Sequence, residues 1–298
     1  MNNKDRMFFK KDLKEKKELV NIEIDRFLPR KDEYPKQIHK AMRYTLFAGG
    51  KRLRPYLLLN VYQLFNDDIS KVLKVAAAIE ILHTYTLIHD DLPDMDDDEI
   101  RRGKKTNHLL FGENIALLAG DALLVNAFEL LAEIDYEDSV KMQLINELAV
   151  AAGSQGLIGG QIMDILSEGK KITPKTLDYI HKNKTGKLIA IAVRFACILA
   201  KAPEKDIKKM EKFAEKIGLA FQIVDDILDV EGSKSTLGKD TGKDNQLGKA
   251  TYPAVFGLDE SKEKAETLIE EAKEILAGYG EKAKALNILC DYIISRKK

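Results

Sequence analysis

The chain has 298 residues, and its 48 Lys and Arg residues equal its 48 Asp and Glu residues in number, so its formal net charge is zero. A chain without net charge has no overall field that attracts polyanions, which argues against general binding to nucleic acid or to a membrane surface. With 45% hydrophobic residues, 32% charged residues and only 7 prolines, the composition excludes a disordered or collagen-like protein.

Cysteine content and the N-terminal residues bear on the cellular location. The two cysteines, Cys197 and Cys290, stand in no C-x-x-C or other metal-binding spacing. This excludes a disulfide scaffold and a structural zinc site, and we expect a reducing, cytoplasmic location. The first 19 residues mix Lys with Asp and Glu, and nowhere do 18 apolar residues follow one another. We therefore expect a protein that is neither exported nor stably inserted in a membrane.

Helical periodicity runs through most of the chain. Apolar residues recur at steps of three and four in residues 72–82, 115–123 and 190–197, and no segment has a convincing strand pattern. Thr173 and Pro174 are typical of an N-cap followed by the first residue of a helix. Helical periodicity without a strand pattern predicts an all-α fold. Because no Pro- or Ser-rich linker divides the chain, we predict a single domain over residues 1–298.

Residues 49–55, Gly-Gly-Lys-Arg-Leu-Arg-Pro, are the first cluster with a chemical pattern. Glycines allow the backbone to approach a ligand closely, helix amides supply partial positive charge, and arginine forks match phosphate oxygens. The cluster, which we call the diphosphate loop, therefore predicts a phosphate site.

Glu80 and His83 form a Glu-x-x-His pattern in the next predicted helix. Di-iron carboxylate proteins use two such patterns, but the nearest second candidate, residues 178–181, begins with Asp. A di-iron centre is thus a weak alternative. His83 by itself is more typical of a core hydrogen bond than of a ligand.

Residues 90–99 contain seven acids in ten positions, and Pro93 indicates that the preceding helix ends near Leu92. Two like charges about 4 Å apart repel by roughly 4 kcal/mol at an effective dielectric of about 20, so crowded carboxylates need cations. Oxygen ligands without Cys or clustered His indicate Mg²⁺. The alternative is an ordinary solvated acidic loop.

A second acidic cluster lies near the end of a later helix. Gln222, Asp225, Asp226 and Asp229 fall at i, i+3, i+4 and i+7, on one helix face with apolar residues around them. Buried ionised groups persist when they are paired or bound to metal, which favours a metal site here.

Basic residues accompany both acidic clusters. They occur in residues 101–105, in residues 184–187 and in the Gly-rich stretch 231–250, where Lys239, Lys243 and Lys249 stand. None belongs to a nucleotide P-loop, because the G-x-x-x-x-G-K-[ST] pattern and its preceding strand are missing from the sequence. If these residues form two basic sites that face two metal-binding sites, they indicate two phosphorylated groups. The stretch 231–250 is a candidate lid over them.

These motifs resemble those of the trans-isoprenyl diphosphate synthases, and most closely the bacterial farnesyl diphosphate synthases. Five motifs agree in order between about Lys36 and Pro253: residues 49–55, 83–93, 101–103, 184–186 and 221–229. The resemblance implies an all-α, single-domain bundle of antiparallel helices around a deep central cavity, and a homodimer.

The resemblance also implies roles for single residues. Three Mg²⁺ ions would bind the carboxylates of Asp90, Asp91, Asp96, Asp225, Asp226 and Asp229. Isopentenyl diphosphate would bind Lys51, Arg54, His83 and Arg102, and the allylic diphosphate would bind Arg101, Lys184 and Lys239. Lys184, Thr185 and Gln222 are the expected catalytic residues, with Thr185 and Gln222 facing the allylic carbon.

The implied reaction is ionisation, condensation and elimination, with isopentenyl, dimethylallyl and geranyl diphosphates as substrates. Tyr85 and Thr86 precede Asp90 on its helix, and a ring five positions before the motif resembles members limited to C15 products. Farnesyl diphosphate is the expected product. The alternatives are a longer-chain, geranylgeranyl diphosphate synthase, a terpene cyclase or head-to-head coupling enzyme, and a non-catalytic subunit of a heteromer. A cyclase binds one diphosphate, so the diphosphate loop argues against it.

Overall fold

The computed structural model describes residues 1–232 and 251–296, and its helices group into two compact units. The first, the N-terminal unit, comprises Leu13–Leu59 and Asp68–Ile145. The second, the C-terminal unit, comprises Met1–Asp12, Asn60–Asp67 and Asn146–Lys298. That residues 1–298 form a single domain stays a prediction.

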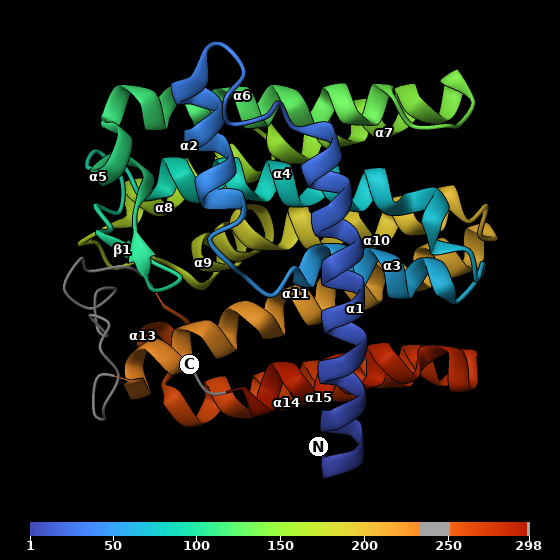
Figure 1. Ribbon diagram of the computed structural model, residues 1–298. Coiled ribbons are helices and arrows are strands. Elements are labelled where there is room, and N and C mark those ends of the chain that lie inside the picture. Colours follow the sequence, from blue (N-terminus) through green and yellow to red (C-terminus); the bar gives the residue numbers. More distant parts are fainter. Residues whose placement is uncertain (233–250, 297–298) are drawn as a thin grey trace. The chain divides into compact units, whose positions relative to one another are not determined.

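The N-terminal unit contains the elements from α1 to the start of α7, except the first part of α1, up to Asp12, and the end of α3, from Asn60 on, which belong to the C-terminal unit. They are α1 (Asn3–Phe27), α2 (Lys36–Leu46), α3 (Leu53–Gln63), η1 (Ile69–Val72), α4 (Leu73–Asp90), β1 (Ile100–Arg101), β2 (Lys104–Lys105), α5 (Asn107–Phe111), α6 (Glu113–Ala132) and the start of α7 (Asp138–Ala152). Its central helix is α4, which is apolar on all sides and packs most extensively against α6 (Figure 1). A helix without a polar face must be buried, and residues 75–82 are all buried.

The C-terminal unit contains the remaining elements. They are α8 (Leu157–Ser167), α9 (Pro174–Ile180), the π-helix η2 (His181–Gly186), α10 (Lys187–Leu199), α11 (Glu204–Gly232), α13 (Tyr252–Phe256), α14 (Leu258–Leu276), η3 (Ala277–Ala283) and α15 (Lys284–Ser295). Helix α11 packs against α10 and α14, and η2 packs against α8 and α11. These contacts hold the stretch around Lys184 and Thr185 in place within this unit.

The predicted all-α class is confirmed, and so are several element boundaries. The three periodic segments lie within η1–α4, α6 and α10, and α4 ends at Asp90, two residues before the predicted limit. Thr173 caps α9 by accepting a hydrogen bond from the amide of Thr176, with Pro174 as the first helical residue.

The expectation that no strand occurs is wrong in one place. β1 and β2 form a short antiparallel hairpin in which Arg101 pairs with Lys104. Its two loop residues, Arg102 and Gly103, have φ angles of 55° and 73°. Positive φ at both central positions is the requirement of a type I′ turn, which matches the twist of the flanking strands.

Among the described residues, two segments are long and apolar enough to cross a membrane on length and composition alone, Ile69–Asp90 and Glu113–Ala132. The first is 72% buried in its most apolar window, as expected of a core helix, whereas the second is only 39% buried. The second segment therefore exposes apolar side chains.

Candidate active site

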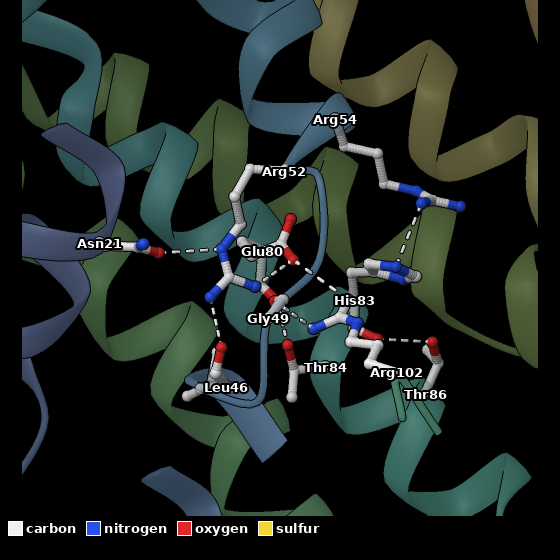
Figure 2. A network of polar contacts seen from close by, with 10 residues as sticks. All are labelled: Asn21, Leu46, Gly49, Arg52, Arg54, Glu80, His83, Thr84, Thr86 and Arg102. Carbon is white, nitrogen blue, oxygen red and sulfur yellow. Dashed lines mark hydrogen bonds and ion pairs between the residues drawn. The ribbon is translucent and has the colours of Figure 1, made fainter. Parts of the chain in front are cut away.

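The diphosphate loop leads into α3 in the N-terminal unit, and its backbone conformation requires glycine. Gly49 and Gly50 have φ angles of 123° and 98°. A Cβ atom on Gly50 would lie 2.5 Å from Cζ of Arg102, so the guanidinium of Arg102 occupies the space that a side chain would need. Nη1 of Arg102 also donates a hydrogen bond to the carbonyl oxygen of Gly49 at 2.8 Å (Figure 2). The loop and the hairpin thus meet although 53 residues separate Gly49 from Arg102.

Arg54 and His83 form the second contact of this cluster. Nη1 of Arg54 lies 3.2 Å from Nε2 of His83 and donates to it (Figure 2). Burial, followed by the charges of Arg54, Arg102, Arg101 and Arg52, lowers the pKa of His83 well below its usual 6.5. His83 is therefore neutral at pH 7, and it contributes hydrogen bonding instead of charge.

Lys51 is exposed in the loop before α3. Lys51, Arg54, His83 and Arg102, the four residues expected at the isopentenyl site, all belong to the N-terminal unit. The contacts bring Arg54 to His83 and Arg102 to the diphosphate loop.

The first acidic cluster follows α4 and contacts the hairpin. Asp91 is buried and forms an ion pair with Nε of Arg101, while Nη2 of Arg101 donates to Asp98 at 3.0 Å. Burial raises the pKa of Asp91 to about 6, and the charge of Arg101 limits the rise. Asp90 and Asp96 are half-buried, and the amide of Asp96 donates to the carbonyl oxygen of Asp90 at 2.9 Å. The loop therefore folds back on the end of α4.

Tyr85 and Thr86 lie on α4 shortly before this cluster. Tyr85 is 5% exposed, and its ring contacts that of His89 edge to face at 5.2 Å. Burial raises the pKa of Tyr85, and the nearby Asp90 and Asp121 add to the rise. The hydroxyl of Thr86 donates to the carbonyl oxygen of His83 at 2.8 Å. The ring of Tyr85 is thus buried one to two turns before Asp90.

A relay of hydrogen bonds connects η2 with α11 in the C-terminal unit. The hydroxyl of Thr185 donates to Oε1 of Gln222 at 2.8 Å, and Nε2 of Gln222 donates to Oδ1 of Asp226 at 2.8 Å. Oδ2 of Asp226 accepts from the amide of Tyr252 at 2.8 Å and lies 3.4 Å from Nε2 of His181. The predicted helix face that carries Gln222 and Asp226 is therefore a connected polar stripe.

Lys184 is held by an acid that the sequence interpretation did not select. Its Nζ donates to Oδ2 of Asp164, on α8, at 2.6 Å. A Cβ atom on Gly160 would lie 2.2 Å from the backbone nitrogen of Lys184, so only glycine permits α8 and η2 to approach this closely.

Asp225 and Asp229, the first and last acids of the second cluster, are partly exposed to solvent. Oδ1 of Asp225 pairs with Nη2 of Arg296 at 2.8 Å, and the Arg296 guanidinium stacks on the ring of Phe221 at 3.9 Å. Asp229 is half-buried one turn later on α11. Lys239 and the candidate lid beyond Gly232 lie outside the described residues.

Comparison with known proteins identifies the family. The family model of the polyprenyl synthetases matches residues 35–289, which is most of the chain. The chain belongs to the polyprenyl synthetase family. Like its curated homologues, this polyprenyl synthetase is an enzyme of the trans-prenyltransferase kind.

Individual relatives agree with this assignment. The synthetase is 46% identical over 287 residues to a farnesyl diphosphate synthase from Geobacillus stearothermophilus, covering 95% of this chain and 96% of the relative. It is 45% identical to a geranylgeranyl diphosphate synthase from Cyanophora paradoxa, covering 95% of each. The crystal structure of an FPP/GFPP synthase from Zymomonas mobilis without ligand superposes with a TM-score of 0.87 at 35% identity, covering 97% of this chain and 99% of that one.

Divalent-metal dependence is general in this family. In the part of the synthetase that the structure describes, no three His, Cys, Asp or Glu side chains converge on one point, and the acids contact protein donors instead. The donor chemistry nevertheless fits a hard cation, since both motifs offer carboxylate oxygens without sulfur. Burial of Asp91, which raises its pKa to about 6, is a cost that a divalent ion would offset.

Sequence reasoning missed the residues that support the predicted ones. Glu80 was considered as an iron ligand, but its carboxylate pairs with Arg52 at 2.7 Å and both side chains are 1% exposed, which overturns the di-iron alternative. Asp164 and Arg296, which pair with Lys184 and Asp225, had no local signal because their partners are 20 residues or more away. One feature of the sequence could have predicted the hairpin, namely Gly103 directly after Arg102, because glycine readily adopts the positive φ angle of a tight turn.

Proposed function

We propose that this polyprenyl synthetase condenses isopentenyl diphosphate with dimethylallyl and geranyl diphosphates to give farnesyl diphosphate, in a Mg²⁺-dependent reaction. The observation that carries the proposal is the cluster of Arg54, His83 and Arg102 around Gly49 and Gly50, which is a cationic site additional to the two acidic motifs. Two diphosphate groups need two such sites, whereas a cyclase needs one.

The isopentenyl diphosphate is assigned to this cationic cluster. Arg54 and Arg102 supply planar forks that match phosphate oxygens, and Lys51 adds an exposed ammonium group. His83 is neutral, so it can orient Arg54 through their 3.2 Å hydrogen bond without adding a charge to be desolvated.

The allylic diphosphate is assigned to Arg101, Lys184 and the acidic motifs. Asp90, Asp91, Asp96, Asp225, Asp226 and Asp229 would hold Mg²⁺, three ions in our proposal. When bound, the metal neutralises the charge that grows on the departing diphosphate. Arg101 and Lys184, now paired with Asp91 and Asp164, would exchange part of these contacts for phosphate oxygens. Interactions that strengthen as the charge develops increase the rate and not only the affinity.

The reacting carbons are assigned to Thr185 and Gln222. The allylic C–O bond breaks and leaves a carbocation, the double bond of the isopentenyl group attacks it, and a proton then leaves to restore a double bond. The released diphosphate takes this proton. Thr185 and Gln222 present oxygen atoms held by their mutual 2.8 Å hydrogen bond, which supports electrostatic stabilisation of the cation.

Control of product length is assigned to Tyr85, whose ring is buried on α4 against His89. Relatives include both farnesyl and geranylgeranyl diphosphate synthases, so identity alone does not select a product. The test is to incubate the pure protein with isopentenyl and geranyl diphosphates, with and without Mg²⁺, and to identify the prenyl alcohol after phosphatase treatment. Farnesol formed only with Mg²⁺ supports the proposal, geranylgeraniol favours the longer-chain alternative, and recovery of no prenyl alcohol longer than the geraniol of unreacted substrate refutes both.

A homodimer is part of the proposal. Leu109 and Leu110 on α5 and Leu117, Leu118 and Val125 on α6 are 45–65% exposed, an apolar surface suited to a second copy. Light scattering should give twice the mass of the chain, 33.6 kDa, and Val125→Glu should shift the mass to that of one chain. We also propose a cytoplasmic location, which the reduced, buried thiols of Cys197 and Cys290 support.

A further inference from the structure

Arg52 stands among the cations of the diphosphate loop, but its side chain is directed into the protein. It is 1% exposed, whereas the neighbouring Lys51 is exposed. Nε of Arg52 donates to Oδ1 of Asn21 at 3.0 Å, Nη1 donates to Oε1 of Glu80 at 2.7 Å, and Nη2 donates to the carbonyl oxygen of Leu46 (Figure 2). A guanidinium buried and engaged in this way is not available to a diphosphate.

The backbone at Arg52 is unusual for a residue with a side chain. Its φ angle is 54°, in the left-handed region that disfavours residues other than glycine. Such a conformation persists where surrounding contacts over-determine it. Here the contacts are those of the guanidinium, so the side chain of Arg52 sets the path of the loop between Gly50 and Arg54.

Glu80 connects this loop with the hairpin. Its carboxylate is 1% exposed on α4, and its Oε1 lies 2.7 Å from Nη1 of Arg52 and 3.9 Å from Nη2 of Arg102. Arg102 in turn donates to the carbonyl oxygen of Gly49. Arg52, Arg54 and Arg102 all lie close enough to His83 to affect it electrostatically. The guanidinium groups of Arg52 and Arg102 repel each other, and the negative charge of Glu80 between them therefore offsets this repulsion and holds them close together.

We propose that the buried Arg52–Glu80 ion pair is a positioning device for the isopentenyl diphosphate site, acting through Arg54 and Arg102. The inference rests on the proposed function. Neither residue touches substrate. Arg52 holds the loop that carries Arg54, and Glu80 holds the guanidinium of Arg102 against Gly49 and Gly50. Glu80 lies three residues before His83, on the same face of α4.

The test compares Arg52→Met, Glu80→Gln and the double variant Arg52→Met/Glu80→Gln. Arg52→Met leaves the buried carboxylate of Glu80 with only the guanidinium of Arg102, 3.9 Å away, and Glu80→Gln leaves the buried guanidinium of Arg52 without this carboxylate. Each single change should lower the melting temperature, whereas the double change removes both charges and should restore much of the stability. We expect the double variant to keep a KM for isopentenyl diphosphate raised at least about tenfold, since misplacement of a binding group by about 1 Å can cost up to 10²-fold. Its KM for geranyl diphosphate should change less than about twofold.

Two further variants separate positioning from stability. Arg52→Lys keeps the charge but cannot reproduce the three-way donation, so it should fold and show an intermediate KM for isopentenyl diphosphate. Arg194→Met is a control in the C-terminal unit, where the side chain of Arg194 is 35% exposed and binds two carboxylates. It breaks the ion pairs of Arg194 with Glu147 and Glu211 and should lower the melting temperature without raising that KM.

The outcomes distinguish the inference from the proposed function. A double variant with the KM of the unmodified protein, or equal rises in KM for both substrates, overturns the positioning role. An unmodified protein that makes no prenyl product overturns the proposed function itself.

Discussion

Replacing Gly50 with Ala would move a substrate-binding group while leaving the fold largely intact. The new Cβ would lie 2.5, 2.6 and 2.8 Å from the Cζ, Nη2 and Nη1 atoms of Arg102. Carbon atoms in contact are normally about 3.5–4.0 Å apart, so the guanidinium must retreat by about 1–1.5 Å. The displaced group is the end of a flexible side chain, so this movement costs little stability. Alanine at a φ angle of 98° adds backbone strain, of the order of 1–2 kcal/mol.

The consequence should appear in substrate binding. A displacement of about 1 Å in a positioned group can reduce catalytic efficiency up to about 10²-fold. We therefore expect Gly50→Ala to raise the KM for isopentenyl diphosphate by one to two orders of magnitude, roughly 10-fold to 100-fold, with little change in the KM for geranyl diphosphate. Initial rates measured while each substrate is varied at saturating concentrations of the other give the two values separately.

Gly49→Ala is the matched control for this measurement. Gly49 has a φ angle of 123°, but a Cβ there would meet no atom within 4 Å. It therefore introduces backbone strain without displacing Arg102. If Gly49→Ala and Gly50→Ala raise the KM for isopentenyl diphosphate equally, the assignment of the effect to Arg102 is refuted.

Three further predictions follow from single residues. Tyr85→Ala removes the buried ring before Asp90, and product chromatography should show prenyl chains longer than C15. The lowered pKa of His83 means that the unfolded chain takes up a proton below pH 6.5 while the folded chain does not, so folding stability is lost as pH falls. Relative to His83→Gln, denaturant titrations should show an additional loss of unfolding free energy between pH 7.5 and pH 5.5, which protonation of the unfolded group limits to at most about 1.4 kcal/mol. Gly160→Ala places a Cβ 2.2 Å from the backbone nitrogen of Lys184. This overpacking should lower the free energy of unfolding, measured by thermal denaturation, by about 1–3 kcal/mol, and it should lower kcat by moving Lys184 and Thr185.

Each of these predictions has a contradicting result. Unchanged C15 output from Tyr85→Ala would remove this residue from product control. Parallel pH dependence of the free energy of unfolding in the unmodified protein and His83→Gln would show that His83 titrates normally. Gly278→Ala is the control for Gly160→Ala, because a Cβ at Gly278 meets no atom within 4 Å. Equal losses of kcat in the two variants would contradict the role of the close approach between α8 and η2.

Local features of the chain were predictable from the sequence. Helical periodicity found the segments of α4, α6 and α10, because the hydrophobic stripe of a helix depends on residues three and four apart. The cap of α9 at Thr173 was predictable because a capping side chain bonds to amides within the next turn. Gln222 and Asp226 could be assigned to one face for the same reason. The acidic clusters signalled cations because neighbouring charges repel wherever the chain places them.

Only the tertiary structure decided which of these charges act on substrate and which support them. Nothing in residues 49–55 distinguishes Arg52, which is buried against Glu80, from Arg54, which reaches His83, since the difference depends on helices 28 residues or more away. Likewise, the guanidinium of Arg102 fills the space above Gly50 only because the hairpin folds back on the diphosphate loop. Sequence spacing determines which side chains share a helix face, but the direction in which a cation points is decided by the acids and carbonyl groups that distant segments bring to it.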